Sequence, residues 1–227
     1  MIMFYMKRDS KKYKGVLFDL DGTILFTLSD ITAAFNVPLI RRSLAELNDN
    51  ETREIVGHGL LNGLKDAFDK RHFLLSEDQL NLAYNELMDY YKSNPTKYCY
   101  VYEGIEELLT KIDIPFGILS NKDDKLVQEI VATVLPNIKF SFVRGMSTKE
   151  SKKPNPFNVI EFAKKHEIAM DDLLYVGDSE VDYKTSVNAE CGLALVAWGY
   201  RDKKDLLKLD VPVCDTVDQL LGVINGS

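Results

Sequence analysis

The sequence has few cysteines and no cluster of cysteine with histidine. Its 227 residues include three histidines and three widely separated cysteines, Cys99, Cys191 and Cys214. Because no CxxC pair or Cys/His cluster is present, the composition argues against a zinc site. An odd number of cysteines in a chain of this size is typical of a reducing compartment.

A long apolar run and an excess of positive charge are also missing. The apolar start from Met1 to Met6 is too short for the apolar region of a signal peptide, and Lys7 and Arg8 follow it instead of preceding it. No stretch approaches the length of a membrane span. The net charge of -7 argues against a general affinity for nucleic acid or anionic membrane. We therefore expect a cytoplasmic monomer or homodimer that binds neither.

What the chain does contain is an alternation of strand and helix patterns. Four short apolar segments are typical of strands buried on both faces of a parallel sheet: Gly15–Phe18, Phe116–Leu119, Leu173–Val176 and Leu193–Val196. Helical patterns cover Gly104–Ile112, Asp123–Leu135, Phe157–His166 and Glu180–Asn188. This alternation predicts an α/β protein with a Rossmann-like parallel sheet.

One long segment interrupts the alternation. Between residues 29 and 94, apolar residues recur at helical spacing and no strand is indicated. Ser76 and Gln79 form a capping box at the start of one of these helices. We interpret the basic segment from Lys7 to Lys14 as a solvated lead-in. The predicted domains are a Rossmann-like core, residues 1–28 and 95–227, and an inserted all-helical cap, residues 29–94.

Acidic residues follow two of the predicted strands. Asp19 and Asp21 end the first strand, and Asp178 and Asp182 follow another. Ligands bind at the carboxyl ends of the strands in such sheets, so we expect these acids to meet in one crevice. Two carboxylates 4 Å apart repel by roughly 4 kcal/mol at an effective dielectric constant near 20. A bound cation relieves this repulsion, and oxygen ligands beside a phosphate favour Mg²⁺.

A phosphate bound beside these acids needs positive charge and hydrogen-bond donors. Lys153 supplies an ammonium group from a loop stiffened by prolines, and Ser120 and Asn121 follow a third strand. Each residue alone has a simpler interpretation: a helix cap for Asp19 or Ser120, and a solvated side chain for Lys153. The presence of four polar segments in one fold argues against those simpler interpretations.

These segments together resemble the haloacid dehalogenase-like hydrolase superfamily. They occur in the family's order and at its spacing, across nearly the whole chain: Phe18–Thr23, Leu119–Asn121, Lys153–Pro156 and Gly177–Asp182. The resemblance implies a Rossmann-like core with a helical cap inserted after the first strand. It also implies a phosphatase in which Asp19 is the nucleophile and Asp21 acts first as general acid and then as general base.

The same resemblance implies a magnesium site and a phosphate site. Mg²⁺ is expected on the Asp19 carboxylate, the Asp21 main-chain carbonyl and Asp178. Asp182 is expected to support this site. The residues expected to bind the substrate's phosphate are Ser120, Asn121 and Lys153, where the Lys-Pro-x-Pro pattern selects Lys153 over Lys152.

Two positions bear on the reaction that the resemblance implies. Thr23 stands where the family's phosphatases usually have threonine and its phosphomutases often have valine. The presence of Asp21 argues against dehalogenation. The alternatives left open are a β-phosphoglucomutase-like phosphomutase and a pyrophosphatase or nucleotidase of the same superfamily. An alternative of a different class is a binding module without catalysis.

Within the superfamily, the chain is most similar to the phosphoglycolate phosphatase-like group, on Val56–Leu60 and Trp198–Arg201. That similarity implies hydrolysis of a small phosphate ester, with 2-phosphoglycolate as the best single guess. Phe26 departs from the group, which usually has an acidic residue there, so the substrate stays open. Gly57, His58 and Gly59 are the candidate specificity residues of the cap, although a histidine that only packs within the cap is an equal alternative.

Overall fold

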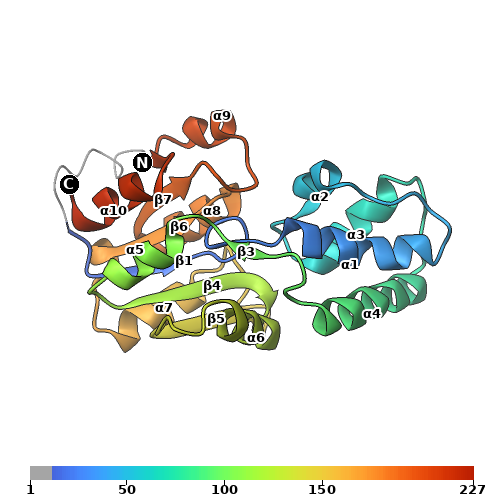
Figure 1. The fold of residues 1–227 in the computed structure, drawn as a ribbon, viewed down its shortest axis with the longest axis horizontal. Coiled ribbons are helices and arrows are strands. Elements are labelled where there is room, and N and C mark those ends of the chain that lie inside the picture. The colour runs from blue at the N-terminus through green and yellow to red at the C-terminus, as the bar shows by residue number, and fades with distance from the viewer. Residues whose placement is uncertain (1–11) are drawn as a thin grey trace. The chain divides into compact units, whose positions relative to one another are not determined.

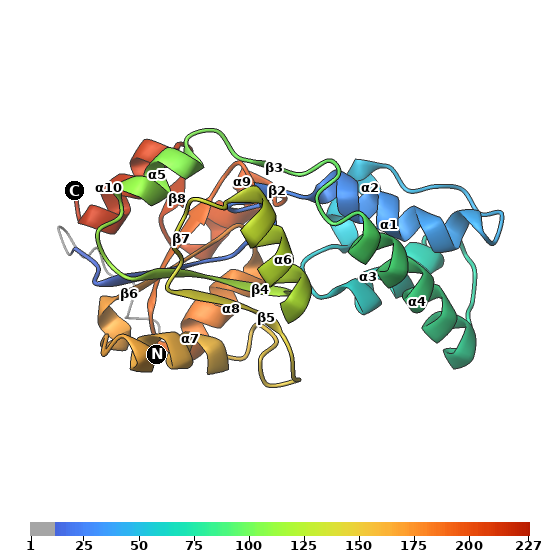
Figure 2. The same ribbon diagram turned by 60° about the horizontal axis from the view of Figure 1, so that its bottom comes forward.

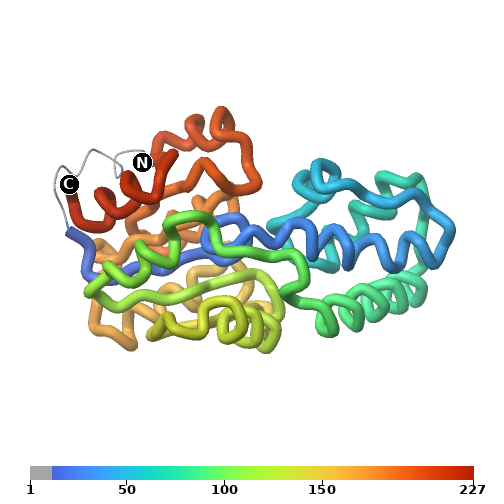
Figure 3. Tube along the Cα trace, viewed as in Figure 1, coloured from blue at the N-terminus to red at the C-terminus, as the bar shows by residue number. Residues whose placement is uncertain are grey.

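The computed structural model describes residues 12–227, which form two compact units. The core unit combines the described residues up to Leu25 with Val101–Ser227, and the helical unit is Phe26–Tyr100. The predicted insert of residues 29–94 lies inside the helical unit. The extra residues at each end belong to two short strands, β2 (Leu25–Phe26) and β3 (Tyr100–Val101), which pair with each other where the chain leaves and re-enters the core (Figure 3).

The core unit is built on a six-stranded parallel sheet, as the alternating pattern predicts (Figure 1). The strand order is β5-β4-β1-β6-β7-β8. The strands are β1 (Gly15–Phe18), β4 (Phe116–Asp123), β5 (Phe142–Met146), β6 (Leu173–Gly177), β7 (Gly192–Val196) and β8 (Val213–Cys214). The α/β fold class with a separate helical unit is therefore confirmed.

Helices cover both faces of this sheet, which explains why β1 and β6 at its centre are apolar. Figure 2 shows α5 (Ile105–Lys111), α6 (Asp124–Val134) and α10 (Val217–Asn225) on one face, and α7 (Phe157–Lys165) and α8 (Glu180–Ala189) on the other. Every residue of β1 is buried. Leu17 and Tyr175 pack with Phe162 of α7 in one buried cluster. Each such side chain contributes about 1.5–3 kcal/mol by its burial.

The two outer strands and the end of β4 were not predicted. β5 contains Arg144 and Gly145, and β8 has only two residues, so neither shows a clear apolar run. β4 continues four residues beyond Leu119 into the polar stretch that ends at Asp123. The remaining short elements of the core are α9 (Lys203–Leu206) and two 3-10 turns, Met170–Asp172 and Leu207–Leu209.

The helical unit contains α1 (Leu28–Ile40), α2 (Asp49–Ile55), α3 (Leu60–Asp69) and α4 (Glu77–Ser93). The predicted capping box at Ser76 and Gln79 starts α4, with both reciprocal hydrogen bonds present. The unit has its own core, which includes Phe35, Phe68 and Tyr91. No helix within residues 12–227 is long and apolar enough to cross a membrane.

The basic segment at the start of the chain is only partly described. Its residues from Lys7 to Lys11 lie outside the described part of the chain. Lys12 and Lys14 pair with the acidic residues Asp113 and Asp172, at 3.6 and 2.8 Å respectively.

Candidate active site

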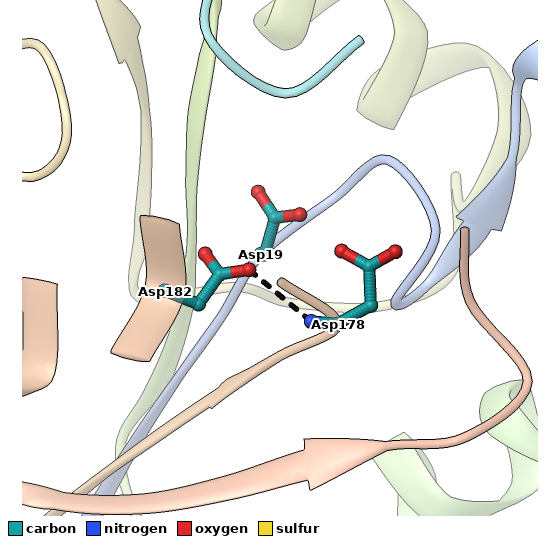
Figure 4. A group of neighbouring side chains, drawn as sticks. All are labelled: Asp19, Asp178 and Asp182. Carbon is teal, nitrogen blue, oxygen red and sulfur yellow. Dashed lines mark hydrogen bonds between the residues drawn. The ribbon is translucent and has the colours of Figure 1, made fainter. Parts of the chain in front are cut away.

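The register of the central strands brings the predicted site residues to one edge of the sheet. Phe18 of β1 lies opposite Ile118 of β4 and Val176 of β6. The residues just beyond these positions therefore leave the sheet together. In Figure 4, the side chains of Asp19, Asp178 and Asp182 extend toward the same space at the ends of β1 and β6.

A tight loop after β1 places Asp19 at this edge. Its N–H donates to the Val176 carbonyl at 2.8 Å, which continues the pairing of β1 with β6. The chain then turns back, because the N–H groups of Ile24 and Leu25 both donate to the Leu20 carbonyl at 3.0 Å. Gly22 allows the turn with φ of +87°, in the left-handed region that favours glycine.

Lys153 is a buried cation at the centre of the site. Its ammonium group lies 2.5 Å from Asp19 Oδ1 and 2.8 Å from Asp182 Oδ1, and the residue is only 4% exposed. Burial by itself lowers the pKa of Lys153, but Asp182 and Asp19 outweigh burial and raise that pKa well above its ordinary value. Lys153 therefore stays charged and neutralises one of the neighbouring acids.

Asn121 positions this lysine. The Asn121 side chain accepts the Lys153 N–H at 2.7 Å and donates to the Lys153 carbonyl at 3.2 Å. Both ends of the amide are therefore engaged by the lysine backbone. The role of Asn121 in binding phosphate directly stays a prediction, and what the structure shows is a support for Lys153.

Asp182 also supports its neighbours, because both of its oxygens are already used. Oδ1 accepts from Lys153, and Oδ2 accepts the N–H groups of Asp178 and Ser179 at 3.1 Å and the Ser179 hydroxyl at 2.6 Å. These bonds start helix α8 with a capping box. Asp182 is fully buried, so its carboxylate depends on these donors.

The other two carboxylates each keep one oxygen without a hydrogen bond. Asp19 Oδ1 accepts from Lys153, and Asp178 Oδ2 accepts the Tyr200 N–H at 2.6 Å. Within residues 12–227, no hydrogen bond reaches Asp19 Oδ2 or Asp178 Oδ1. Burial and the charge of Asp182 raise the pKa of Asp178 from 3.8 to about 7. Burial also raises the pKa of Asp19 well above its ordinary value. Lys153 lowers this pKa, whereas the negative charges of Asp182 and Asp178 raise it further.

This donor set fits a divalent cation. One oxygen from each of Asp19, Asp178 and Asp182 lies within 4.8 Å of the others, and all three residues are buried. Three carboxylates against the single ammonium of Lys153 leave two negative charges uncompensated when all are ionised. An oxygen-ligated divalent ion such as Mg²⁺ would neutralise that charge and keep Asp19 ionised.

Asp21 lies beside this cluster and is held by different partners. Its Oδ2 accepts the Ser120 hydroxyl at 3.2 Å, and its Oδ1 lies 2.9 Å from the Lys122 ammonium. The structure thus brings together Asp21 and Ser120, both named from the sequence. The use of the Asp21 main-chain carbonyl as a metal ligand stays a prediction.

Lys122 is a site residue that the sequence analysis missed. It is only 5% exposed, so the site contains a second buried ammonium group besides Lys153. A signal was present in the sequence: Lys122 follows Ser120 by two residues, and alternate residues of a strand share a face. It went unused because β4 was predicted to end at Leu119.

The candidate specificity residues Gly57, His58 and Gly59 lie in the helical unit, in the loop before α3. Both glycines have positive φ, +108° and +97°, which a side chain would make unfavourable. His58 Nε2 lies 2.9 Å from Asp66 Oδ2, and both side chains are about two-fifths exposed. The structure therefore fixes one imidazole nitrogen within the unit. The role of all three residues in specificity stays a prediction.

Phe26, the departure noted from the sequence, also lies in the helical unit. Its ring stacks on Tyr100 with the ring centroids 4.9 Å apart. Because Phe26 and Tyr100 come from β2 and β3, this stacking joins the two segments that connect the units. The apolar residue at position 26 thus has a local structural role.

Known proteins are similar to this chain over most of its length. A 26% identical protein named phosphoglycolate phosphatase, from Chromobacterium violaceum, aligns over 86% of this chain and 90% of its own length. Another of that name, from Vibrio vulnificus, is 26% identical over 94% of this chain and 97% of its own. A crystal structure from Lactobacillus delbrueckii subsp. bulgaricus, described as a candidate phosphoglycolate phosphatase, is 26% identical with a TM-score of 0.86, covering 96% of this chain and all of its own.

The family model described as haloacid dehalogenase-like hydrolase matches residues 16–196, which span the sheet from β1 to β7 and the whole helical unit. That range contains all four polar segments at the strand ends. The chain belongs to the haloacid dehalogenase-like hydrolase family.

Proposed function

We propose that this protein is a Mg²⁺-dependent phosphatase of small phosphate monoesters, which acts through an aspartyl-phosphate on Asp19, with 2-phosphoglycolate as its substrate. The observation that carries the proposal is the buried ammonium of Lys153 between Asp19 and Asp182, beside a third carboxylate on Asp178. The relatives named phosphoglycolate phosphatase support the choice of substrate.

In the first half of the reaction, an oxygen of the Asp19 carboxylate attacks phosphorus. A new bond forms between that oxygen and phosphorus while the bond to the ester oxygen breaks. The Asp21 carboxyl donates its proton to the departing oxygen, so an alcohol leaves. Lys153 stabilises the negative charge on the non-bridging oxygens, which makes the phosphorus easier to attack.

In the second half, water releases the phosphate. Asp21 is now a carboxylate and takes a proton from the attacking water molecule. Water oxygen bonds to phosphorus while the bond to Asp19 breaks, which returns Asp19 as a carboxylate and yields inorganic phosphate. Ser120 and Lys122 hold the two oxygens of Asp21, so the same carboxylate stays in place for both proton transfers.

Mg²⁺ would be held by the carboxylates of Asp19 and Asp178 and by the main-chain carbonyl of Asp21. When bound, it supplies charge neutralisation for the phosphate and for the ligating acids. Asp182 would stay outside the ligand set, because its oxygens are occupied by Lys153 and by the N–H groups that begin α8.

The test is release of inorganic phosphate from 2-phosphoglycolate, with MgCl₂ or with excess EDTA. We expect turnover only with the metal, and a kcat/KM for 2-phosphoglycolate above that for other small phosphate esters. A higher kcat/KM for another ester would change the assigned substrate but leave the proposed phosphatase reaction in place. No phosphate release from any ester in a broad panel, with MgCl₂ present, would overturn the proposal and favour a binding module.

A further inference from the structure

The segment Trp198–Arg201 takes no part in the steps above, although it follows β7 directly beside the site. We propose that Trp198, Gly199 and Tyr200, here called the strap, lock the Asp178 carboxylate in the single orientation that offers Oδ1 to the divalent cation. The inference rests on the proposed metal site. It states that residues which do not touch the ion set the affinity of this site for Mg²⁺.

The first contact is a main-chain hydrogen bond to Asp178. The Tyr200 N–H donates to Asp178 Oδ2 at 2.6 Å, a short distance that is typical of a charge-assisted bond. Tyr200 is 5% exposed and Asp178 is 3% exposed, so water does not compete for this bond. One oxygen of Asp178 is thereby occupied, and the other is left for a ligand.

The second contact is steric. A Cβ atom at Gly199 would lie 2.3 Å from Asp178 Cβ, 2.5 Å from Asp178 Oδ2 and 2.6 Å from the Gly22 carbonyl oxygen. A Cβ atom at Gly22 would lie 2.4 Å from Asp178 Oδ2. The carboxylate is thus enclosed between two glycine backbones. Gly199 is needed for this close approach and not for a left-handed backbone, because its φ is not in that region.

Both ends of the strap are anchored to other site loops. The Trp198 indole N–H donates to the Thr23 carbonyl at 3.1 Å, in the loop that follows Asp19. At the other end, Arg201, the residue directly after the strap, forms a two-point ion pair with Glu180, at 2.9 and 3.3 Å, in the first turn of α8. The strap therefore ties the loop after β1 to the loop after β6, and these loops supply both proposed carboxylate ligands.

A metal ligand held in one orientation binds without first losing its rotational freedom. Removing a group that orients a ligand commonly weakens metal binding about 10- to 100-fold, without any change in the ligands. The strap should thus set the Mg²⁺ affinity while leaving Asp19 and Lys153 in place.

The test is the Gly199→Ala variant, measured by thermal unfolding over a range of MgCl₂ concentrations. A ligand that binds only the folded state stabilises it by an amount that grows with the logarithm of the ratio of free ligand to Kd, so the titration of the unfolding midpoint yields an apparent Kd without any substrate. We expect Kd for Mg²⁺ to rise about 10- to 100-fold. High MgCl₂ should restore kcat, a rescue that general damage to the fold would not show.

The matched control is Gly222→Ala on α10, where the nearest atom to a new Cβ is 3.3 Å away and belongs to the Ser227 carbonyl. Its Kd should equal that of the wild type. Trp198→Phe serves where Gly199→Ala fails to fold, because it removes the N–H donor to Thr23 and keeps an aromatic ring at the position. We expect it to weaken Mg²⁺ binding severalfold.

Two results would overturn the proposal that the strap sets the Mg²⁺ affinity. The first is that folded Gly199→Ala or Trp198→Phe binds Mg²⁺ with the same Kd as the wild type. The second is that MgCl₂ shifts the unfolding midpoint of the wild type no more than NaCl of equal ionic strength does. The proposed function fails in a different way: the wild type would still bind Mg²⁺ but would release no phosphate.

Discussion

The site at the end of the sheet and the loop at Gly57–Gly59 each have a basic side chain close to an aspartate, in opposite environments. Lys153 lies 2.8 Å from Asp182 with both side chains at most 3% exposed, whereas His58 lies 2.9 Å from Asp66 with both about two-fifths exposed. An exposed pair contributes about 0–1 kcal/mol. Removing one partner of a buried pair costs about 3–5 kcal/mol, because the other charge stays buried without compensation.

The comparison teaches where chemistry and specificity can reside in this chain. The core site depends on side chains from four separate segments, and Asn121, Lys153 and Asp182 each make two or more hydrogen bonds within it. The loop in the helical unit contains the contact between His58 and Asp66, a hydrogen bond from the Asn62 side chain to the His58 carbonyl, and two glycines in the left-handed region. Changes at the core site should therefore abolish the reaction, while changes in the loop should only alter how well a substrate binds.

The largest expected effect is at the nucleophile. Asp19→Asn should reduce kcat roughly 10⁴-fold or more, because an amide cannot form the aspartyl-phosphate. Phosphate release measures the loss, and Asp113→Asn, an exposed acid of the same unit, is the control that should keep full activity. Near wild-type turnover in Asp19→Asn would remove the nucleophile from this position.

Protonation of Asp178 should make stability fall as pH rises in the absence of metal. Its folded pKa of about 7 exceeds the ordinary 3.8, so between these values the folded state binds more protons than the unfolded state. Without Mg²⁺, the free energy of unfolding should decrease by up to about 4 kcal/mol from pH 4 to pH 7. Denaturant unfolding measures it.

Two comparisons sharpen the pH prediction. Mg²⁺ replaces the proton on the carboxylate, so the decline with pH should become shallower when the ion is present. Asp178→Asn removes the ionisable group, and its stability should also vary less across this range. An increase in wild-type stability over the same range, without metal, would show that Asp178 is ionised in the folded protein.

Lys122 should have the next effect, on the chemical step. Lys122→Met removes the ammonium from Asp21 and should lower kcat about 10²-fold. Lys70→Met, which removes an exposed partner of Glu54 in the helical unit, should change kcat less than about twofold. Steady-state kinetics of both variants compare the two regions directly, and equal losses in the pair would contradict the distinction drawn between them.

The smallest effect is expected at His58. His58→Ala should raise KM for 2-phosphoglycolate by up to about fivefold, the equivalent of 1 kcal/mol, with kcat little changed. The KM for p-nitrophenyl phosphate, which lacks a carboxylate, should stay the same. A parallel change of KM for both substrates would argue that His58 only packs within the helical unit.

Much of the core was predictable because its central strands are buried on both faces. Gly15–Phe18 is an unbroken apolar run, and its bounds agree with β1. The outer strand β5, with Arg144 and Gly145, has one neighbouring strand and carries no such run, so it was missed. The same weakness at the end of β4 hid Lys122, since a polar strand end is indistinguishable from a loop in the sequence.

Among the site residues, the sequence alone determined which acids stand at the strand ends, because local patterns of apolar and polar residues mark where a buried strand stops. Only the tertiary structure decided what each one contacts. Asn121 holds the Lys153 backbone, Asp182 accepts a hydrogen bond from Lys153, and Gly199 packs against Asp178. The contact between Lys153 and Asp19 joins residues 134 positions apart. Such distances close only when the sheet assembles, so no local pattern encodes them.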